Sequence, residues 1–278
     1  MKNDELGERM KSYYEDRTRL FIPRRTYTII RLDGKSFHTY TKGFDRPYDL
    51  GLMRVMDNTA IALCKHVQNV KMAYVQSDEI SLLLTDFDTI HTDAWFGGNI
   101  QKMASVSASI ATAHFNNGMY LDEDIMANMD KVAYFDSRVF SIPDPNEVIN
   151  YFIWRQQDAT RNSIQMGAQS VYSQKELHKK NTSELQELMF QKGINWNDYP
   201  VGFKRGRIIL KEVEGLVTIM PNPKSTYVAK DLVNGKVVAA KDILEPQQVT
   251  RITWGVFDPP VFTQDREFLK QRIPLIGE

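Results

Sequence analysis

The sequence predicts an α+β fold of the ferredoxin-like type, in which an antiparallel sheet carries helices on one face. The first observation is the order of elements, because residues 26–142 suggest strand, helix, strand, strand, helix and strand, the split βαβ arrangement. The second is size, since 278 residues with 42% hydrophobic content can bury a sizeable core. We predict that residues 1–143 form this core domain and that residues 144–278 are a helical and β-hairpin elaboration packed on it.

The elements of the first domain follow from local patterns. An apolar stripe at helical spacing predicts a packing helix over 4–21, and the nearly continuous apolar run 26–32 predicts a strand in the middle of the sheet. Asp49 is placed to cap a helix that reaches about residue 67. Residues 71–76 and 80–84 then predict a hairpin.

A second long helix is expected to begin at Asp93, as its cap, and to run to about Phe115, with Asn117-Gly118 ending it. The last strand of the first domain is predicted at 131–135 or 137–142.

In the second domain, Asp144-Pro145 predicts a helix that reaches about residue 166, because aspartate caps helices and proline suits the first helical position. Further helices are expected at 184–191 and 264–272. The remaining predictions are short strands at 207–210 and 216–220 and a tight Asn234-Gly235 hairpin over 232–238.

Composition excludes several classes of protein. The 35 basic and 35 acidic side chains give a formal net charge of zero, so no global positive field attracts nucleic acid. The single cysteine, Cys64, excludes an internal disulfide framework, and the five histidines lack the spacing of zinc ligands. No run approaches the roughly 20 apolar residues of a membrane span, and the charged start 1–5 is unlike a secretory signal. These features predict a cytoplasmic protein without a membrane partner.

Two acidic turns, Asp33-Gly34 and Ser77-Asp78-Glu79, are the candidate chemistry of the chain. In the predicted topology, the end of the strand 26–32 and the tip of the following hairpin lie on the same edge of the sheet, so Asp33 and Asp78 become neighbours. Two carboxylates so placed, with the main-chain carbonyl of Gly34, suit two Mg²⁺ ions about 4 Å apart. Each dipeptide alone is more often a simple turn, whereas the two together favour a metal site.

A nucleotide is expected beside these carboxylates. Backbone amides from Gly34 to His38, at the start of a helical turn, are candidates to cradle phosphates, with Lys35 and Arg46 as phosphate cations. On the helix after Asp144, either Arg155 simply pairs with Asp158, or Arg155, Asp158 and Asn162 face the acidic edge and contact nucleotide or RNA. Basic side chains that either contact an RNA backbone or belong to solvated faces are Arg24, Arg25, Lys204, Arg205 and Arg207.

Three segments resemble motifs of the tRNA-histidine guanylyltransferase family, which includes the tRNA-histidine guanylyltransferase-like proteins. They are Arg31-Leu32-Asp33-Gly34-Lys35-Ser36-Phe37-His38, Gln76-Ser77-Asp78-Glu79 and Trp154-Arg155-Gln156-Gln157-Asp158, and the resemblance runs over about residues 1–210. It implies a polymerase-type palm that adds nucleotides to the 5′ end of tRNA in the 3′-to-5′ direction. The 5′-monophosphate is first activated with ATP or GTP, and the 3′-hydroxyl of an incoming nucleoside triphosphate then attacks the activated end.

The resemblance also implies roles for individual residues. Asp33, Asp78 and the carbonyl of Gly34 bind Mg²⁺, and Glu79 joins the two aspartates as a carboxylate of the catalytic motif. With the residues named above, the expected nucleotide-binding set is Asp33, Gly34, Lys35, Ser36, Phe37, His38, Arg46, Ser77, Asp78, Lys102 and Asn162. The expected RNA-binding set is Arg24, Arg25, Arg155, Lys204, Arg205 and Arg207. A homotetramer is implied as well.

Two departures from the family pattern bear on the substrate. Members that act on tRNA-histidine carry His-Ile-Asn-Asn where this chain has Thr160-Arg161-Asn162-Ser163. They also have a basic stretch before the second long helix, and this chain has Gly97-Gly98-Asn99 in its place. The sequence therefore favours template-dependent repair of 5′-truncated tRNA over addition of an extra guanosine to tRNA-histidine. The same residues also leave open a palm-type nucleotidyl cyclase and a non-catalytic RNA-binding protein.

Overall fold

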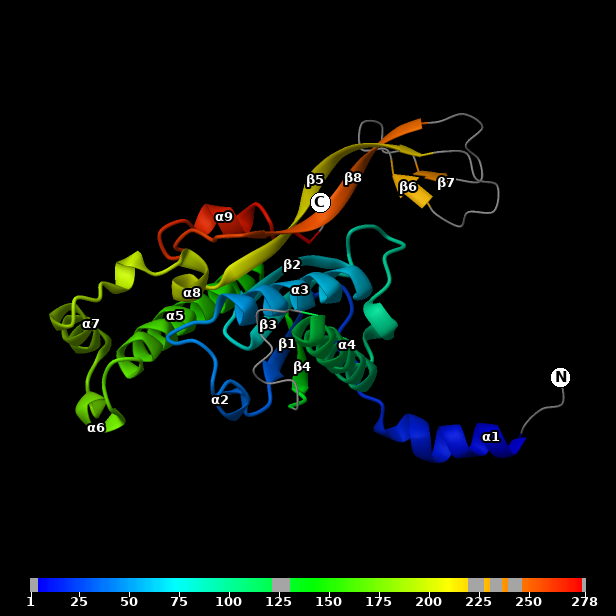
Figure 1. The fold of residues 1–278 in the computed structure, drawn as a ribbon. Helices are drawn as coiled ribbons and strands as arrows, with labels where there is room; N and C mark the ends of the chain where they lie inside the picture. The colour runs from blue at the N-terminus through cyan, green and yellow to red at the C-terminus, as the bar shows by residue number, and fades with distance from the viewer. Residues whose placement is uncertain (1–4, 122–130, 220–227, 231–236, 240–246, 277–278) are drawn as a thin grey trace. The chain divides into compact units, whose positions relative to one another are not determined.

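A computed structural model describes residues 5–121, 131–219, 228–230, 237–239 and 247–276 (Figure 1). The chain forms two compact units, one made of residues 1–209 with 256–278 and the other of residues 210–255. The predicted boundary at residue 143 stays a prediction. No helix among the described residues is both long enough and apolar enough to span a bilayer.

The main element of the fold is a six-stranded sheet with the strand order β4-β1-β3-β2-β5-β8. Its strands are β1 (Tyr27–Gly34), β2 (Val70–Gln76), β3 (Glu79–Leu84), β4 (Phe135–Ile142), β5 (Arg207–Ile219) and β8 (Gln247–Phe257). The pairs β1–β3, β1–β4, β2–β3 and β2–β5 are antiparallel. Together with helices α3 (Leu50–His66) and α4 (Ile100–Leu121), the first four strands confirm the predicted ferredoxin-like order and the central place of β1.

Alternation along the strands gives the sheet two different faces. One face is packed by α3 and α4, and apolar residues such as Ile30 and Leu32 are fully buried in the core. On the other face, Arg31 lies opposite Ser81 and Asp33 lies opposite Glu79. Helix α5 (Pro145–Gln169) packs on this polar face. The two faces explain how a strand with a buried core can also present charged side chains to a site.

The second long helix begins later than the sequence suggests. A 3₁₀ turn, η3 (Trp95–Gly98), precedes α4, and Gly97 and Gly98 have positive φ angles that an α-helix does not accept. Asn99 is therefore the cap, since its side chain accepts a hydrogen bond from the Lys102 amide at 3.0 Å. Asp93 pairs with Arg24 instead.

The predicted end of this helix is also wrong. Helix α4 continues through Asn117-Gly118 to Leu121. Gly118 lies where α4 meets α3, and a Cβ there would be 2.9 Å from the Cγ1 of Val55. The glycine therefore permits a close approach between helices and does not terminate one.

The predicted N-terminal helix is helical over residues 5–18, but only its first part is an α-helix and it buries no residue. It consists of α1 (Glu5–Met10), a π-helical turn η1 (Lys11–Glu15) and a 3₁₀ turn η2 (Asp16–Thr18), none of which has a buried residue. Its apolar side chains Leu6, Met10 and Tyr13 are exposed.

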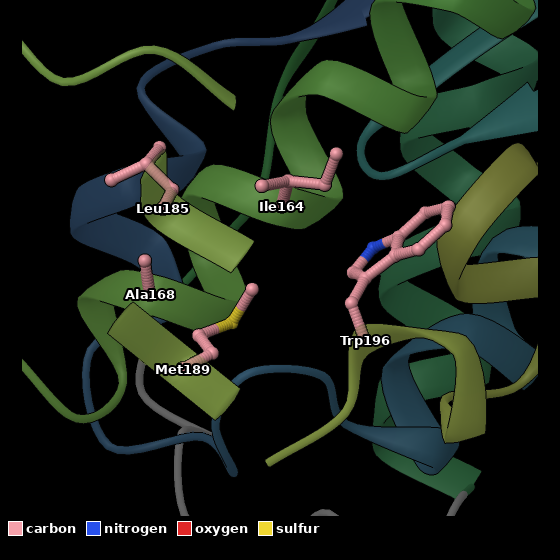
Figure 2. Close-up of a cluster of buried hydrophobic side chains, with 5 residues drawn as sticks. All are labelled: Ile164, Ala168, Leu185, Met189 and Trp196. Carbon is pink, nitrogen blue, oxygen red and sulfur yellow. The ribbon is translucent and has the colours of Figure 1, made fainter. Parts of the chain in front are cut away.

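The second half contains the predicted long helix. Asp144 caps α5 by accepting hydrogen bonds from two amides of its first turn. Figure 2 shows how the C-terminal part of α5 packs against α7 (Thr182–Gln191) through a cluster of Ile164, Ala168, Leu185, Met189 and Trp196. The other described elements of the chain are α2 (Phe37–Tyr40), α6 (Gln174–Leu177), η5 (Trp196–Asp198), α8 (Val201–Arg205), β6 (Val228–Lys230), β7 (Val237–Ala239) and α9 (Arg266–Lys270).

The strands near the C-terminal end differ from the predicted ones. The two short strands predicted at 207–210 and 216–220 are one strand, β5. The Asn234-Gly235 turn lies outside the described residues, although the flanking β6 and β7 pair in the antiparallel manner of a hairpin.

Candidate active site

Asp33 and Asp78 meet on one edge of the sheet, as the topology predicts. Asp33 ends β1 opposite Glu79, the first residue of β3, and the amide of Gly34 donates a hydrogen bond to the carbonyl of Asp78 at 3.1 Å. The Asp33 side chain is 37% exposed. Burial raises the pKa of Asp78 to about 6, and the neighbouring charges of Asp33 and Glu79 add to this, against hydrogen bonds from Ser77 and from the backbone.

Both turns that carry these carboxylates are held in unusual backbone conformations. Ser36 has a φ angle of 56° and Ser77 a φ angle of 47°, in the left-handed region that non-glycine residues rarely adopt. Such residues cost on the order of 1–3 kcal/mol each and gather at functional sites. The two acidic turns therefore share a local feature that their sequences do not predict.

Gly34 is required for a reason other than the approach of a ligand. A Cβ on Gly34 would lie 2.2 Å from the ring of Phe37. Phe37 is buried and packs against Tyr40, Phe115 and Phe135. The glycine thus lets an aromatic core cluster reach the end of β1.

Glu79 lies behind the two aspartates in a buried network of charges. Arg155 donates from Nη1 to Oε1 and Oε2 of Glu79 at 2.9 and 3.0 Å, and Arg31 Nε is 3.1 Å from Oε2. Gln76 donates to Oε1 at 3.2 Å. Protein donors thus contact both oxygens of Glu79, and its expected catalytic role stays a prediction.

The same network corrects the expectation for Arg155. Its side chain is 3% exposed, and its Nη1 also lies 3.6 Å from Oδ2 of Asp158. The predicted pairing of Arg155 with Asp158 is confirmed, whereas burial against Glu79 leaves no surface with which Arg155 can contact RNA.

A cavity of about 670 Å³ opens beside the carboxylates. Its lining includes most of the residues expected to bind nucleotide, namely Asp33, Gly34, Ser36, Phe37, His38, Arg46, Ser77, Asp78 and Asn162. Two expected residues, Lys35 and Lys102, are exposed and do not line it.

Other lining residues were missed by the sequence analysis. Two of them are Gln165 and Gln169, which continue the face of α5 that carries Asp158 and Asn162, at spacings of three and four residues. This helical period could have identified them. Tyr48 also lines the cavity and packs on Phe203, with ring centroids 5.0 Å apart. These two come from distant segments, so no local pattern indicates their meeting.

The predicted phosphate cradle is smaller than expected. The amide of Gly34 is bonded to Asp78, and the amide of Lys35 donates to the carbonyl of Tyr134 at 2.8 Å. Neither is free for a phosphate, which restricts the expected cradle to the amides of residues 36–38.

The basic residues expected to contact RNA lie in different surroundings. Lys204 is buried and donates to the carbonyl of Asn197, and Arg207 is buried against Asp57. Both side chains are buried and bound to partners within the fold, which corrects the expectation that they are exposed to an RNA backbone, although Arg207 also lines the cavity. Arg24, although paired with Asp86 and Asp93, is accessible, as is Arg25, while Arg205 is half-buried.

Strand β4 adds two charged side chains that the sequence analysis did not single out. Asp136 lies opposite Asp33 and Arg138 lies opposite Arg31 in the antiparallel register. Nη2 of Arg138 is 3.9 Å from Oδ2 of Asp33 and 3.4 Å from Oδ1 of Asp136, and its side chain is 53% exposed. The ambiguous placement of this strand in the sequence concealed its register.

The donor set at the edge suits a particular kind of metal. Within the described residues, no group of three or more histidine, cysteine, aspartate or glutamate side chains is arranged to hold an ion. Two carboxylates with one carbonyl fit Mg²⁺, which takes few protein oxygens and keeps water or phosphate ligands. They do not fit zinc, which uses three or four protein ligands.

Comparisons with known proteins show what the chain is similar to. A family model described as tRNAHis guanylyltransferase matches residues 7–143. A bacterial tRNA(His) guanylyltransferase (Thg1)-like protein solved in complex with ATP is 39% identical, with a TM-score of 0.78 over 98% of this chain and 100% of that chain. A structure of the same description in complex with GTP is 37% identical, with a TM-score of 0.74 and the same coverage. The tRNA(His) guanylyltransferase of Saccharomyces cerevisiae is 27% identical, with a TM-score of 0.62 over 72% of this chain and 90% of that chain.

Proposed function

Because the chain belongs to the tRNA(His) guanylyltransferase family and is a nucleotidyltransferase, we propose that it repairs 5′-truncated tRNA by templated 3′-to-5′ nucleotide addition. The observation that carries the proposal is that Asp33 and Asp78 meet and both line a cavity large enough for a nucleotide. Binding of ATP and GTP is supported by the two related bacterial structures that contain them.

The residues of the site divide the work of the reaction. Asp33, Asp78 and the carbonyl of Gly34 would hold Mg²⁺, which when bound activates the attacking hydroxyl and neutralises charge on the triphosphate. The cavity beside them holds the nucleotide, with Arg46 and the amides of residues 36–38 facing its phosphates.

Two further properties belong to the same proposal. A cytoplasmic location agrees with the single, buried cysteine, since a reducing compartment needs no disulfides. A homotetramer is proposed from the family resemblance, and its expected mass is four times the 32.1 kDa of the chain. Size-exclusion chromatography with light scattering tests this assembly.

The activity is tested with Mg²⁺, nucleoside triphosphates and a 5′-truncated tRNA that carries a 5′-monophosphate. We expect lengthening at the 5′ end by nucleotides complementary to the 3′ strand. Asp33→Ala and Asp78→Ala should abolish it, whereas Asp16→Ala, which removes an exposed carboxylate outside the cavity, should not.

Each competing function would give a different experimental result. Addition of one guanosine to full-length tRNA-histidine, without templated extension, would indicate the guanylyltransferase activity. A cyclic nucleotide formed without RNA would indicate a cyclase. RNA binding that survives both aspartate substitutions, with no turnover, would indicate a binding protein.

A further inference from the structure

Trp154 is a half-exposed aromatic side chain beside the acidic edge, outside the lining of the nucleotide cavity. It is 50% exposed, although it lies on α5 next to the buried Arg155. The guanidinium of Arg155 lies against the indole, with its Cζ 3.5 Å from the ring centroid. One face of the ring is thus covered by a cation, and half of the side chain faces solvent.

The support beneath this ring is rigid. Arg155 is bound by both oxygens of Glu79 and lies near Asp158, so its plane cannot rotate freely. Tyr151 contacts the indole edge-on, with ring centroids 6.0 Å apart. An aromatic surface held in place before binding loses little conformational entropy when a ligand stacks on it.

The position of Trp154 relates it to the reacting groups. Arg31 Cζ lies 5.9 Å from the indole centroid, and Arg31 is two residues before Asp33 on the same face of β1, about 7 Å along the strand. Across the β1–β4 pair, Arg138 reaches within 3.9 Å of Asp33. Trp154 therefore lies near Arg31, two positions before Asp33, and a second cation, Arg138, reaches the same carboxylate from β4.

The nucleotide cavity extends along a different part of α5. Its lining begins at Asp158, one turn beyond Trp154, and continues to Gln169. Trp154 is thus available to a substrate other than the nucleotide in the cavity.

Resting on the proposed function, we propose that Trp154 stacks a nucleobase at the 5′ end of the RNA substrate while Arg138 contacts its phosphate. Stacking on an aromatic ring accepts every base, because every base has a π-face, which suits an enzyme whose nucleotide choice is set by a template. The guanidinium of Arg138 is exposed and matches a phosphate anion.

The test is a binding measurement with a 5′-truncated tRNA that carries 2-aminopurine as its terminal 5′ base. Stacking on Trp154 is expected to quench the 2-aminopurine fluorescence of the wild-type complex. Trp154→Leu should remove the quenching and weaken RNA binding by about fivefold to a hundredfold. Trp154→Phe should keep most of both, since a flat ring remains.

Two controls separate stacking from a general defect. Phe96→Leu removes another exposed aromatic side chain, on η3 and outside the cavity, and should change neither signal. ATP affinity of Trp154→Leu should stay close to that of the wild type, because the nucleotide cavity does not include this residue. A cooperative thermal unfolding transition above the assay temperature should show that the variant is folded.

The outcomes distinguish this inference from the proposed function. A wild-type protein that quenches the probe but extends no RNA would contradict the function and leave the stacking site in place. Quenching that persists in Trp154→Leu would overturn the stacking site. So would an equal loss of RNA and ATP affinity in both the Leu and the Phe variants, which would make the role structural.

Discussion

Asp33 and Asp78 carry the same carboxylate group in different surroundings. Asp33 is partly open to solvent at the end of β1, whereas Asp78 lies in a strained turn where burial raises its pKa to about 6. The two therefore differ in how readily they hold a negative charge. The sequence gives no indication of this difference between the two aspartates, because the difference depends on burial.

The raised pKa of Asp78 predicts a pH dependence of stability in the metal-free protein. The unfolded chain releases this proton near the ordinary pKa of 3.8 and the folded protein near 6, so the folded state binds more protons between these values. The free energy of unfolding should therefore fall as pH rises from about 4 to about 6, by up to about 3 kcal/mol.

Urea unfolding with EDTA at pH 4 and at pH 7 measures this change. Asp78→Asn, which cannot titrate, should lose less stability over the range than the wild type, while Asp16→Asn at an exposed site should match the wild type. Equal losses in Asp78→Asn and the wild type would assign the pH dependence to other groups.

Gly34 offers a second test at the residue scale. Gly34→Ala should displace the Phe37 ring and destabilise the fold by about 1–3 kcal/mol, because the new Cβ overlaps the ring. Adding Phe37→Leu should make the alanine less costly than it is alone, as a double-mutant cycle by urea unfolding would report. Independent, additive losses would contradict this explanation of the glycine.

At the scale of elements, α5 is fastened to the tip of the β2–β3 hairpin by the buried pair of Arg155 and Glu79. Removing one partner of such a pair leaves a charge without compensation inside the protein. We expect Arg155→Met and Glu79→Gln each to cost about 3–5 kcal/mol, and the double variant to cost clearly less than their sum.

The matched control is the exposed pair of Arg19 and Glu15, in which Arg19→Met should cost less than about 1 kcal/mol. Urea unfolding measures all four variants. Strict additivity of the Arg155 and Glu79 effects would show that the two do not depend on each other.

How well the sequence predicts where a helix starts or ends depends on whether neighbouring residues alone decide that boundary. Asp49 and Asp144 cap their helices as predicted, because a cap is decided by neighbouring residues. The start of α4 was misplaced because Gly97 and Gly98 adopt positive φ angles that leave Asn99 as the cap, while Asp93 pairs with Arg24, far away in the sequence. The apolar side chains of α1 are exposed, although their helical spacing in the sequence predicts burial.

For the whole molecule, the order of elements was enough to predict which edge of the sheet carries the carboxylates. It was not enough to predict which cations are available. Arg155, Lys204 and Arg207 have the residue type of RNA contacts, yet each is satisfied by a partner within the fold. Arg138 was missed because its role depends on register across the β1–β4 pair.

The register of β1 against β3 limits where this chain can accept an inserted residue. Asp33 lies on the same face of β1 as Arg31 only because the two are two positions apart along the strand. One residue inserted into β1 would turn the carboxylate towards the apolar α3 and α4 face, and one inserted between Gln76 and Glu79 would change the two-residue turn that carries Asp78. A library of single-residue insertions should therefore yield no active clones in these two segments, while exposed segments outside the sheet such as 5–18 remain permissive.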